Sequence, residues 1–283
     1  MSVAAPIDID ALRAYIGRQE RSSDVLTPRL CRELCATLGE SADGPVPLGS
    51  HWCLFPVIAP AAELDNDGHS RRGRFLPPVP LPRRMWASGA LQILDRLRVG
   101  DRVERHSRIA DVSVKDGRSG KLCFVGVEHA ISTDRGLAIK ENQQIVYRSA
   151  AVPGDSGALA PRDTADSQAQ SRAVRTILID TVRLFRYSAV TFNAHRIHYD
   201  RAYAIGTEGY PGLVVHGPLQ ASLLLELAAE EHGGESPQTF SFRALRPVFE
   251  GPVTLYVDSA GETMRLWTAG HDGLPAMSAV ATW

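Results

Sequence analysis

The same order of elements occurs twice along this chain of 283 residues, and the repetition strongly limits the possible folds. In the C-terminal half, Leu219, Leu223 and Leu227 predict the apolar face of a helix that begins at Gly217 and ends at Gly233-Gly234. Alternating apolar and polar residues then predict four strands. These runs lie at 240–244, 253–258, 264–266 and 277–283. An antiparallel sheet that buries one face on a helix satisfies this order.

The N-terminal half repeats this order more faintly. Four strand-like runs lie at 85–94, 102–114, 122–133 and 137–147. Asp116-Gly117 and Arg135-Gly136 predict hairpin turns between the last three of them. The helix before the strands is expected in the apolar stretch 52–62, although Pro56 and Pro60 interrupt its pattern. We therefore predict a tandem α+β fold, with two antiparallel sheets that are each wrapped around a central helix.

The stretch from residue 150 to residue 171 separates the two halves. It begins with a Pro-Gly-Asp-Ser-Gly segment and continues with many Ala, Asp and Gln residues, a composition that is typical of linkers. We predict an N-terminal domain at 1–150, a linker at 151–171 and a C-terminal domain at 172–283.

Charge and composition exclude several classes of partner. The net charge of −1 gives no bulk electrostatic reason to expect binding to nucleic acid or to an anionic membrane. No apolar run approaches the length of a membrane span, and residues 1–10 lack a basic region followed by an apolar core, so we expect a cytoplasmic protein. Cys31, Cys35, Cys53 and Cys123 are interpreted as small buried residues rather than as metal ligands or disulfides.

Two histidines three residues apart carry most of the functional signal. On a helix, His195 and His198 would share a face and could bind a metal, but no cysteine or acidic residue stands at a zinc-like spacing. A pair of structural, hydrogen-bonded histidines is a second interpretation. We favour acid/base chemistry, because histidine titrates near the working pH. Asn193 can orient a water molecule or simply shape the loop, since a carboxamide carries no proton away.

A predicted helix start follows the two histidines. Gly217 fits the N-cap position and Pro218 the first helical position. Gly217 offers an unobstructed backbone N–H where the helix dipole favours negative charge, although simple capping is the alternative. A proton-shuttling group beside such a donor is what addition of water across an activated double bond requires. The sequence contains no phosphate-binding loop and no esterase Gly-x-Ser-x-Gly motif.

The two segments 192–200 and 212–220 together resemble the motif of the MaoC-type hydratases and dehydratases, which have the hot-dog fold. The resemblance is greatest to the double hot-dog branch, which includes mesaconyl-CoA and itaconyl-CoA hydratases and the mitochondrial 3-hydroxyacyl thioester dehydratases. It extends to 83–89 and 240–251, so it involves both halves. It implies two hot-dog domains, of which the first has a degenerate site and the second carries the catalytic motif.

The resemblance also implies roles for individual residues. In R-specific enoyl-CoA hydratases the motif reads Asp-x-Asn-Pro-x-His. His198 matches its histidine, whereas Asn193 stands in place of the aspartate and His195 in place of the asparagine. His198 is therefore expected to transfer protons while Asn193 and His195 position the water, unless another acid/base group comes from elsewhere in the chain. Gly217 would donate its N–H to the thioester oxygen. The resemblance implies no metal and no cofactor.

The implied substrate is a coenzyme A thioester bound in a tunnel between the halves. Acyl groups of this branch carry a free carboxylate. Burying that charge unpaired costs several kcal/mol, so we expect a cation beside it. The candidates for contacts with the acyl group or the coenzyme are Arg83, Arg84, Trp86, His216, Arg243 and Arg246.

We therefore predict a hydratase that adds water reversibly to a short, branched, unsaturated dicarboxylyl-CoA. The leading reaction converts itaconyl-CoA or mesaconyl-CoA to citramalyl-CoA, as in itaconate degradation. The alternatives are a 3-hydroxyacyl thioester dehydratase of fatty-acid synthesis, a thioesterase and a non-catalytic acyl-CoA binder. A homodimer is mildly favoured, although two fused halves already supply the pair that single-domain relatives form by dimerising.

Overall fold

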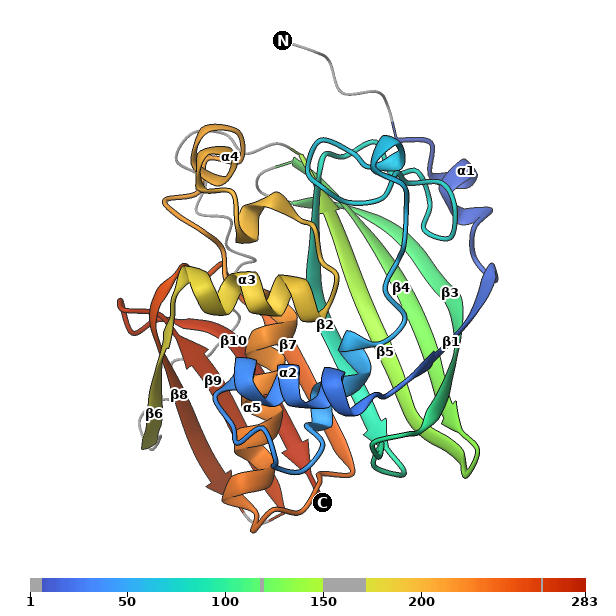
Figure 1. Cartoon of the computed structure of the whole chain (residues 1–283). Helices are drawn as coiled ribbons and strands as arrows, with labels where there is room; N and C mark the ends of the chain where they lie inside the picture. The colour runs from blue at the N-terminus through green and yellow to red at the C-terminus, as the bar shows by residue number, and fades with distance from the viewer. Residues whose placement is uncertain (1–6, 118–119, 150–171, 261) are drawn as a thin grey trace.

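Ten strands form one continuous antiparallel sheet in the computed structural model (Figure 1). The structure describes residues 7–117, 120–149, 172–260 and 262–283, and the predicted linker lies outside them. The strands of the N-terminal half are β1 (Gln19–Val25), β2 (Arg83–Ile93), β3 (Arg102–Gly117), β4 (Gly120–Thr133) and β5 (Gly136–Arg148). The strands of the C-terminal half are β6 (Arg172–Ile179), β7 (Thr239–Ala244), β8 (Gly251–Ala260), β9 (Thr263–Ala269) and β10 (Pro275–Thr282).

The strand order is β1-β3-β4-β5-β2-β7-β10-β9-β8-β6, which is one five-strand pattern followed by its reverse. β2 and β7 join the two patterns, with Ser88 opposite Arg243 and Gln92 opposite Thr239. The two predicted sheets are therefore a single sheet. The physical reason is that this pairing satisfies backbone groups which two separate sheets would leave exposed along their edges.

All eight predicted strands are confirmed, and the two that the sequence did not predict are the outermost ones. β1 consists almost entirely of polar residues and alternates between half-buried and exposed positions. Such an edge strand lacks the alternation of apolar and polar side chains on which strand prediction depends.

The central helix of the C-terminal half is α5 (Gly217–Glu231), which packs on β7, β9 and β10 (Figure 1). Its leucines at 219, 223, 224, 225 and 227 are all buried, because α2 (Pro28–Leu38) and the short 3-10 helix η1 (Leu48–Cys53) also contact the helix. The helix begins one position earlier than predicted. His216 is the N-cap, and Gly217 and Pro218 are the first two helical residues.

The N-terminal half has no central helix of comparable length. Between α2 and β2 the described chain forms only η1 and a second 3-10 helix, η2 (Ala61–Glu63). The helix predicted within 52–62 is therefore wrong, because Pro56 and Pro60 remove the backbone donors that a helix needs. The inner faces of β3, β4 and β5 are covered by loops instead, and a cavity lies against them.

The remaining helices are α1 (Ile9–Arg13), α3 (Thr181–Val190), η3 (Arg196–His198) and α4 (Arg201–Gly206). α3 leads into the histidine motif, and its apolar residues are only partly buried. Val182 and Phe185 are exposed, whereas Leu184 and Tyr187 are buried. All four cysteines are buried and free, as predicted.

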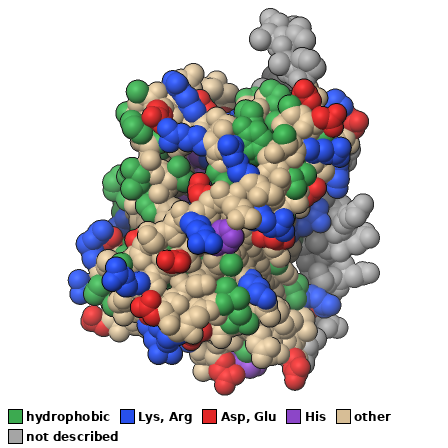
Figure 2. All heavy atoms as spheres, turned by 90° about the vertical axis from the view of Figure 1, so that its right-hand side faces the viewer, with side chains coloured by type: hydrophobic (Ala, Val, Ile, Leu, Met, Phe, Trp, Pro, Cys, Tyr) green, Lys and Arg blue, Asp and Glu red, His purple; other side chains and the backbone are tan. Residues whose placement is uncertain are grey.

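Surface charges are mixed rather than segregated. On the face shown in Figure 2, Lys and Arg side chains are interspersed with Asp and Glu side chains. Among the residues that the structure describes, no helix is long and apolar enough to cross a membrane.

Candidate active site

A cavity of about 1010 Å³ is lined by side chains from both halves of the molecule. The C-terminal half contributes Tyr187 and Ser188 from α3, Asn193 from the following loop and Pro218 from the start of α5. The N-terminal half contributes the inner faces of β2 to β5 and much of the loop between η1 and β2. Asn193 and Ala194 of the histidine motif and Pro218 at the helix start therefore line this cavity, whereas His195, His198, His216 and Gly217 are not among its lining residues.

The loop after α3 holds Asn193 in a tight turn. Phe192, just before it, has a positive φ of 50°. Asn193 Oδ1 accepts a hydrogen bond from the backbone N–H of His195 at 3.0 Å. This bond commits the carbonyl oxygen of the carboxamide to the loop, as in an Asx turn, and leaves the amide group for the cavity.

His198 is buried, with 7% of its surface exposed. Its Nδ1 lies 2.7 Å from the Val214 carbonyl oxygen, which can only accept, so Nδ1 carries a proton and Nε2 keeps its lone pair. Burial lowers the pKa of His198 to about 4, so the ring is neutral near pH 7. A neutral imidazole of fixed tautomer is suited to accept a proton.

His216 supports His198 from one side. The two rings stack with their centroids 3.7 Å apart, and His216 Nε2 lies 2.8 Å from Ser188 Oγ. Because His216 is fully buried, its pKa is held well below the ordinary value. Neither ring is among the residues that line the cavity.

Gly217 lies where α5 begins and where its dipole is most positive. A Cβ atom on Gly217 would lie 3.4 Å from Cε3 of Trp86, an ordinary van der Waals contact, so a methyl group fits there beside Trp86. Both Trp86 and Pro218 line the cavity, on either side of this glycine. The backbone donor at the helix start is thus close to the cavity and unobstructed by a side chain of its own.

A carboxylate–imidazole pair that the sequence did not predict lies beside the motif. His69 Nδ1 is 2.9 Å from Asp67 Oδ2, and the backbone N–H of His69 donates to Asp67 Oδ1 at 2.8 Å. Burial opposes ionisation of Asp67, but these hydrogen bonds outweigh it and keep the pKa of the carboxyl well below its usual range. Burial lowers the pKa of His69 to about 4, with a further contribution from the charge of Arg84.

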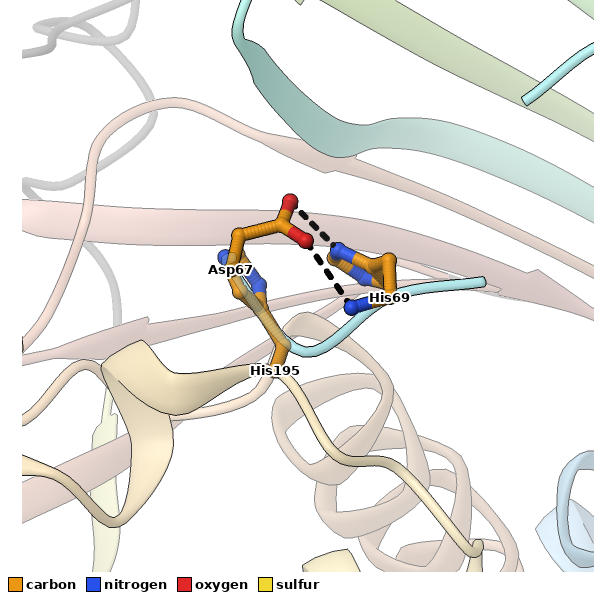
Figure 3. A group of neighbouring side chains, drawn as sticks. All are labelled: Asp67, His69 and His195. Atoms are coloured by element: carbon orange, nitrogen blue, oxygen red, sulfur yellow. Dashed lines mark hydrogen bonds and ion pairs between the residues drawn. The ribbon is translucent and has the colours of Figure 1, made fainter. Parts of the chain in front are cut away.

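The loop that carries this pair is docked on the histidine motif (Figure 3). The backbone N–H of Arg196 donates to the Asp67 carbonyl oxygen at 2.9 Å. Gly68 has a φ of +92°, and a Cβ atom there would lie 1.8 Å from the Ala194 carbonyl oxygen, so this contact requires glycine. The close approach brings the His69 and His195 rings to a centroid distance of 4.2 Å.

His195 connects the new pair to His198. Its ring centroid is 5.4 Å from that of His198, and burial holds its pKa well below the ordinary value. Ligand atoms of Asp67, His69 and His195 lie within 4.8 Å of one another, so the group also has a composition that suits a divalent transition metal. The predicted absence of a metal stays a prediction.

Of the four arginines predicted to contact the substrate, Arg84 lines the cavity and the other three are not among its lining residues. Arg83 is buried in an ion pair with Glu208 at 2.8 Å. Arg246 is held in an ion pair by the turn between β9 and β10, and Arg243 is exposed on β7. These three side chains are occupied or directed elsewhere, so Arg84 is the predicted arginine that an acyl group in the cavity can reach.

A row of polar residues crosses the inner face of the N-terminal strands. Ser107, His129 and Glu141 are cross-strand neighbours on β3, β4 and β5, and Ser107 Oγ lies 2.8 Å from His129 Nδ1. Glu141 Oε1 accepts from Trp52 Nε1 at 2.8 Å. Arg105 lines the cavity beside this row and makes no hydrogen bond or ion pair with other residues in the described part of the chain.

One of these features, the polar pocket that includes Arg105, could have been predicted from the sequence. Val103, Arg105 and Ser107 alternate on one face of β3, and the face that holds Val103 is the buried one. A charged residue at an inward position marks a polar pocket. Asp67 and His69 had no comparable signal, because only the folded loop brings them to His195.

Comparison with known proteins shows the relationships of the chain. A model of the family "Hydroxyacyl-thioester dehydratase type 2" matches residues 49–250. The chain is 42% identical over 272 residues to a mesaconyl-C(4)-CoA hydratase of Chloroflexus aurantiacus, with 94% of this chain and 95% of that protein covered. It is 27% identical over 257 residues to the mitochondrial hydroxyacyl-thioester dehydratase type 2 of Schizosaccharomyces pombe, with 77% and 79% covered. These matches confirm the predicted resemblance.

Comparison with solved structures tests the predicted fold. A Mycobacterium tuberculosis protein described as a double hot-dog fold has a TM-score of 0.56 to this chain at 12% identity, with 94% of this chain and 96% of that chain covered. The predicted double hot-dog fold is thus supported, with the correction that its strands form one sheet.

Proposed function

We propose that this chain, which belongs to the hydroxyacyl-thioester dehydratase type 2 family, is an acyl-CoA hydratase that acts on a short, branched, unsaturated dicarboxylyl-CoA. The observation that carries the proposal is the buried, neutral His198, which stacks on the N-cap residue of α5 beside the cavity that Asn193 and Pro218 line. This arrangement combines a proton acceptor with a backbone donor for a thioester oxygen.

In the proposed reaction, a water oxygen bonds to the β-carbon of the unsaturated acyl group, and the electron pair of the double bond moves toward the thioester oxygen. The N–H of Gly217 stabilises the charge on that oxygen, a type of contact whose loss costs about 10²–10³ in rate. The Asn193 amide group helps to hold the water. His198 shuttles a proton between the water and the α-carbon, so that the elements of water are added across the double bond.

The substrate class follows from the relative and from the cavity. The relative with 42% identity is named for hydration of mesaconyl-C(4)-CoA, an unsaturated acyl group with a free carboxylate. Arg84 lines the cavity and is our candidate for pairing with such a carboxylate, because guanidinium and carboxylate groups form two parallel hydrogen bonds. We propose mesaconyl-CoA, whose double bond is conjugated with the thioester, as substrate and citramalyl-CoA as product. Itaconyl-CoA, whose double bond joins the β- and γ-carbons, would need an allylic proton shift before the same step.

A 3-hydroxyacyl thioester dehydratase of fatty-acid synthesis is the second candidate. The family model and the Schizosaccharomyces pombe relative favour it. Arg105 weighs against it, because an uncharged acyl chain in the cavity would cover the guanidinium group without pairing its charge.

An assay with a panel of unsaturated acyl-CoAs, followed by absorbance and mass, tests the proposal. We expect mesaconyl-CoA or itaconyl-CoA to gain one water while crotonyl-CoA stays unchanged. Hydration of crotonyl-CoA in preference to both dicarboxylyl esters would favour the second candidate. Release of free thiol would indicate a thioesterase, and binding of every ester without conversion would indicate a non-catalytic binder.

A further inference from the structure

The histidine motif leaves one chemical requirement unmet. Hydration moves a proton off the water and puts a proton on the α-carbon, and two acid/base groups can divide this work. Asn193 cannot take a proton, and its carbonyl oxygen is already bonded to the backbone of His195. Within the motif, the site proposed above thus has His198 as its acid/base group on the cavity side of α5.

The loop at 64–70 brings a carboxylate and an imidazole to the same place. A bridge between Leu64 and Ser70 closes the loop, and the N–H of Gly68 donates to the Asp65 carbonyl oxygen at 2.9 Å. His69 lies on the cavity wall, whereas Asp67 lies behind it. The carboxylate therefore reaches the cavity through the imidazole and not directly.

Hydrogen bonding fixes the chemical state of this imidazole. An ionised Asp67 can only accept, so its bond to Nδ1 places the proton of His69 on that nitrogen and leaves the lone pair on Nε2. A base held in this way gains stability when it becomes charged, because the imidazolium stays paired with the carboxylate. His198 has a neutral carbonyl oxygen in the corresponding position, which stabilises a positive ring less.

We propose that His69, oriented by Asp67, is the second acid/base group of the site and takes the place of the aspartate that the motif lacks. The inference rests on the proposed hydratase function. His69 is then a catalytic residue that contacts the water, and Asp67 is a positioning residue that acts through it.

The proposed step balances with one water and no further reactant. The water oxygen bonds to the β-carbon as His69 Nε2 takes one of its protons, and the π electrons become an enolate whose oxygen receives the Gly217 N–H. The proton then passes from His69 through His195 to His198, along rings whose centroids are 4.2 Å and 5.4 Å apart. His198 delivers it to the α-carbon, the enolate electrons form the C–H bond, and both histidines return to their neutral state.

The variants His69→Gln and Asp67→Asn test this division of labour, with exposed His271→Gln as the matched control. The readouts are hydration of the dicarboxylyl-CoA substrate, exchange of the α-proton of the hydrated product in D₂O, and binding of the product by calorimetry. We expect His69→Gln to lose about 10²–10⁴ in hydration while it keeps α-proton exchange and product binding within a few-fold. Asp67→Asn should show a smaller loss of the same kind, and the control should match the unmodified protein.

Three outcomes would overturn the inference. Unchanged hydration in His69→Gln would remove the catalytic role. Equal loss of hydration, exchange and binding in both variants would show that the loop only supports the fold. A tightly held metal ion whose removal by a chelator abolishes hydration would show that Asp67, His69 and His195 are ligands instead. If the unmodified protein hydrates no acyl-CoA at all, the proposed function fails first and the inference falls with it.

Discussion

The two halves of the sheet share one strand pattern but differ in what their inner faces contact. In the C-terminal half, α5 covers apolar side chains such as Leu255, Leu266 and Ala279, all of them buried. In the N-terminal half, the corresponding face presents Ser107, His129 and other polar residues to a cavity. The same strand order therefore forms a sheet packed on a helix in the C-terminal half and a sheet that lines a cavity in the N-terminal half.

The length of the central helix accounts for this difference. A helix of 15 residues fills the concave side of β7 to β10 and presents its N-terminus at a fixed place. In the other half, η1 has 6 residues, and the chain continues as a loop that carries Asp67 and His69. Shortening one helix thus created both a cavity and a loop that completes the site from the opposite side.

The variant Gly217→Ala is expected to have the largest effect in the C-terminal half. The added methyl group makes an ordinary contact with Trp86 at 3.4 Å, so the variant should fold. The group narrows the approach of the thioester oxygen to the backbone donor, so hydration should fall by up to about 10²–10³. The matched control is Gly206→Ala on α4, where a Cβ atom meets nothing within 4 Å. If the two variants lost the same fraction of the hydration rate, the proposed role of Gly217 in the reaction would be contradicted.

In the N-terminal half, Arg84→Met tests the contact with the acyl carboxylate. Loss of a charge-assisted hydrogen bond of about 1.5–3 kcal/mol should raise KM for a dicarboxylyl-CoA about 10- to 100-fold, with a smaller change in kcat. Arg246→Met, which changes an arginine away from the cavity, should leave KM unaltered. If KM rose more for Arg246→Met than for Arg84→Met, the acyl carboxylate would bind near Arg246 in the C-terminal half instead.

Acid should destabilise both halves through their buried histidines. Burial lowers the pKa of His51 to about 3 and that of His198 to about 4, from the ordinary histidine value of about 6.5. Between these values and 6.5 the unfolded chain binds more protons than the folded chain. The free energy of unfolding should therefore fall with decreasing pH by roughly 1.4 kcal/mol per pH unit for each such histidine.

Urea unfolding at pH 7.5, 6.0 and 5.0 measures this slope. His51→Gln and His198→Gln should each reduce it by the contribution of one histidine. A slope that neither variant changes would mean that these rings do not stay neutral in the folded protein.

The sequence predicted the strands and α5 well because their side chains alternate or share one face, as in Leu219, Leu223 and Leu227. It could not predict that β2 and β7 would join the two sheets, since pairing between sheet edges leaves no local pattern. The helix expected at 52–62 failed because apolar content was weighed above Pro56 and Pro60.

For the site, the sequence identified the residues that are close along the chain. Asn193, His195, His198 and Gly217 lie within one region of sequence, and the fold packs them together beside the cavity that Asn193 lines. The Asp67 loop could not be found in this way, because its position depends on the close contact between Gly68 and Ala194. The site residues of the histidine motif could therefore be predicted from the sequence, whereas Asp67 and His69 in the N-terminal half could not.

The most direct test of the account is the rate at which His198→Ala hydrates the dicarboxylyl-CoA substrate, measured together with its affinity for the coenzyme A ester. His198 is buried against His216, the N-cap residue of α5, and the neighbouring Tyr199 lines the cavity, so we predict a folded protein that binds the ester and loses about 10²–10⁴ in turnover. Turnover equal to that of the unmodified protein would contradict it.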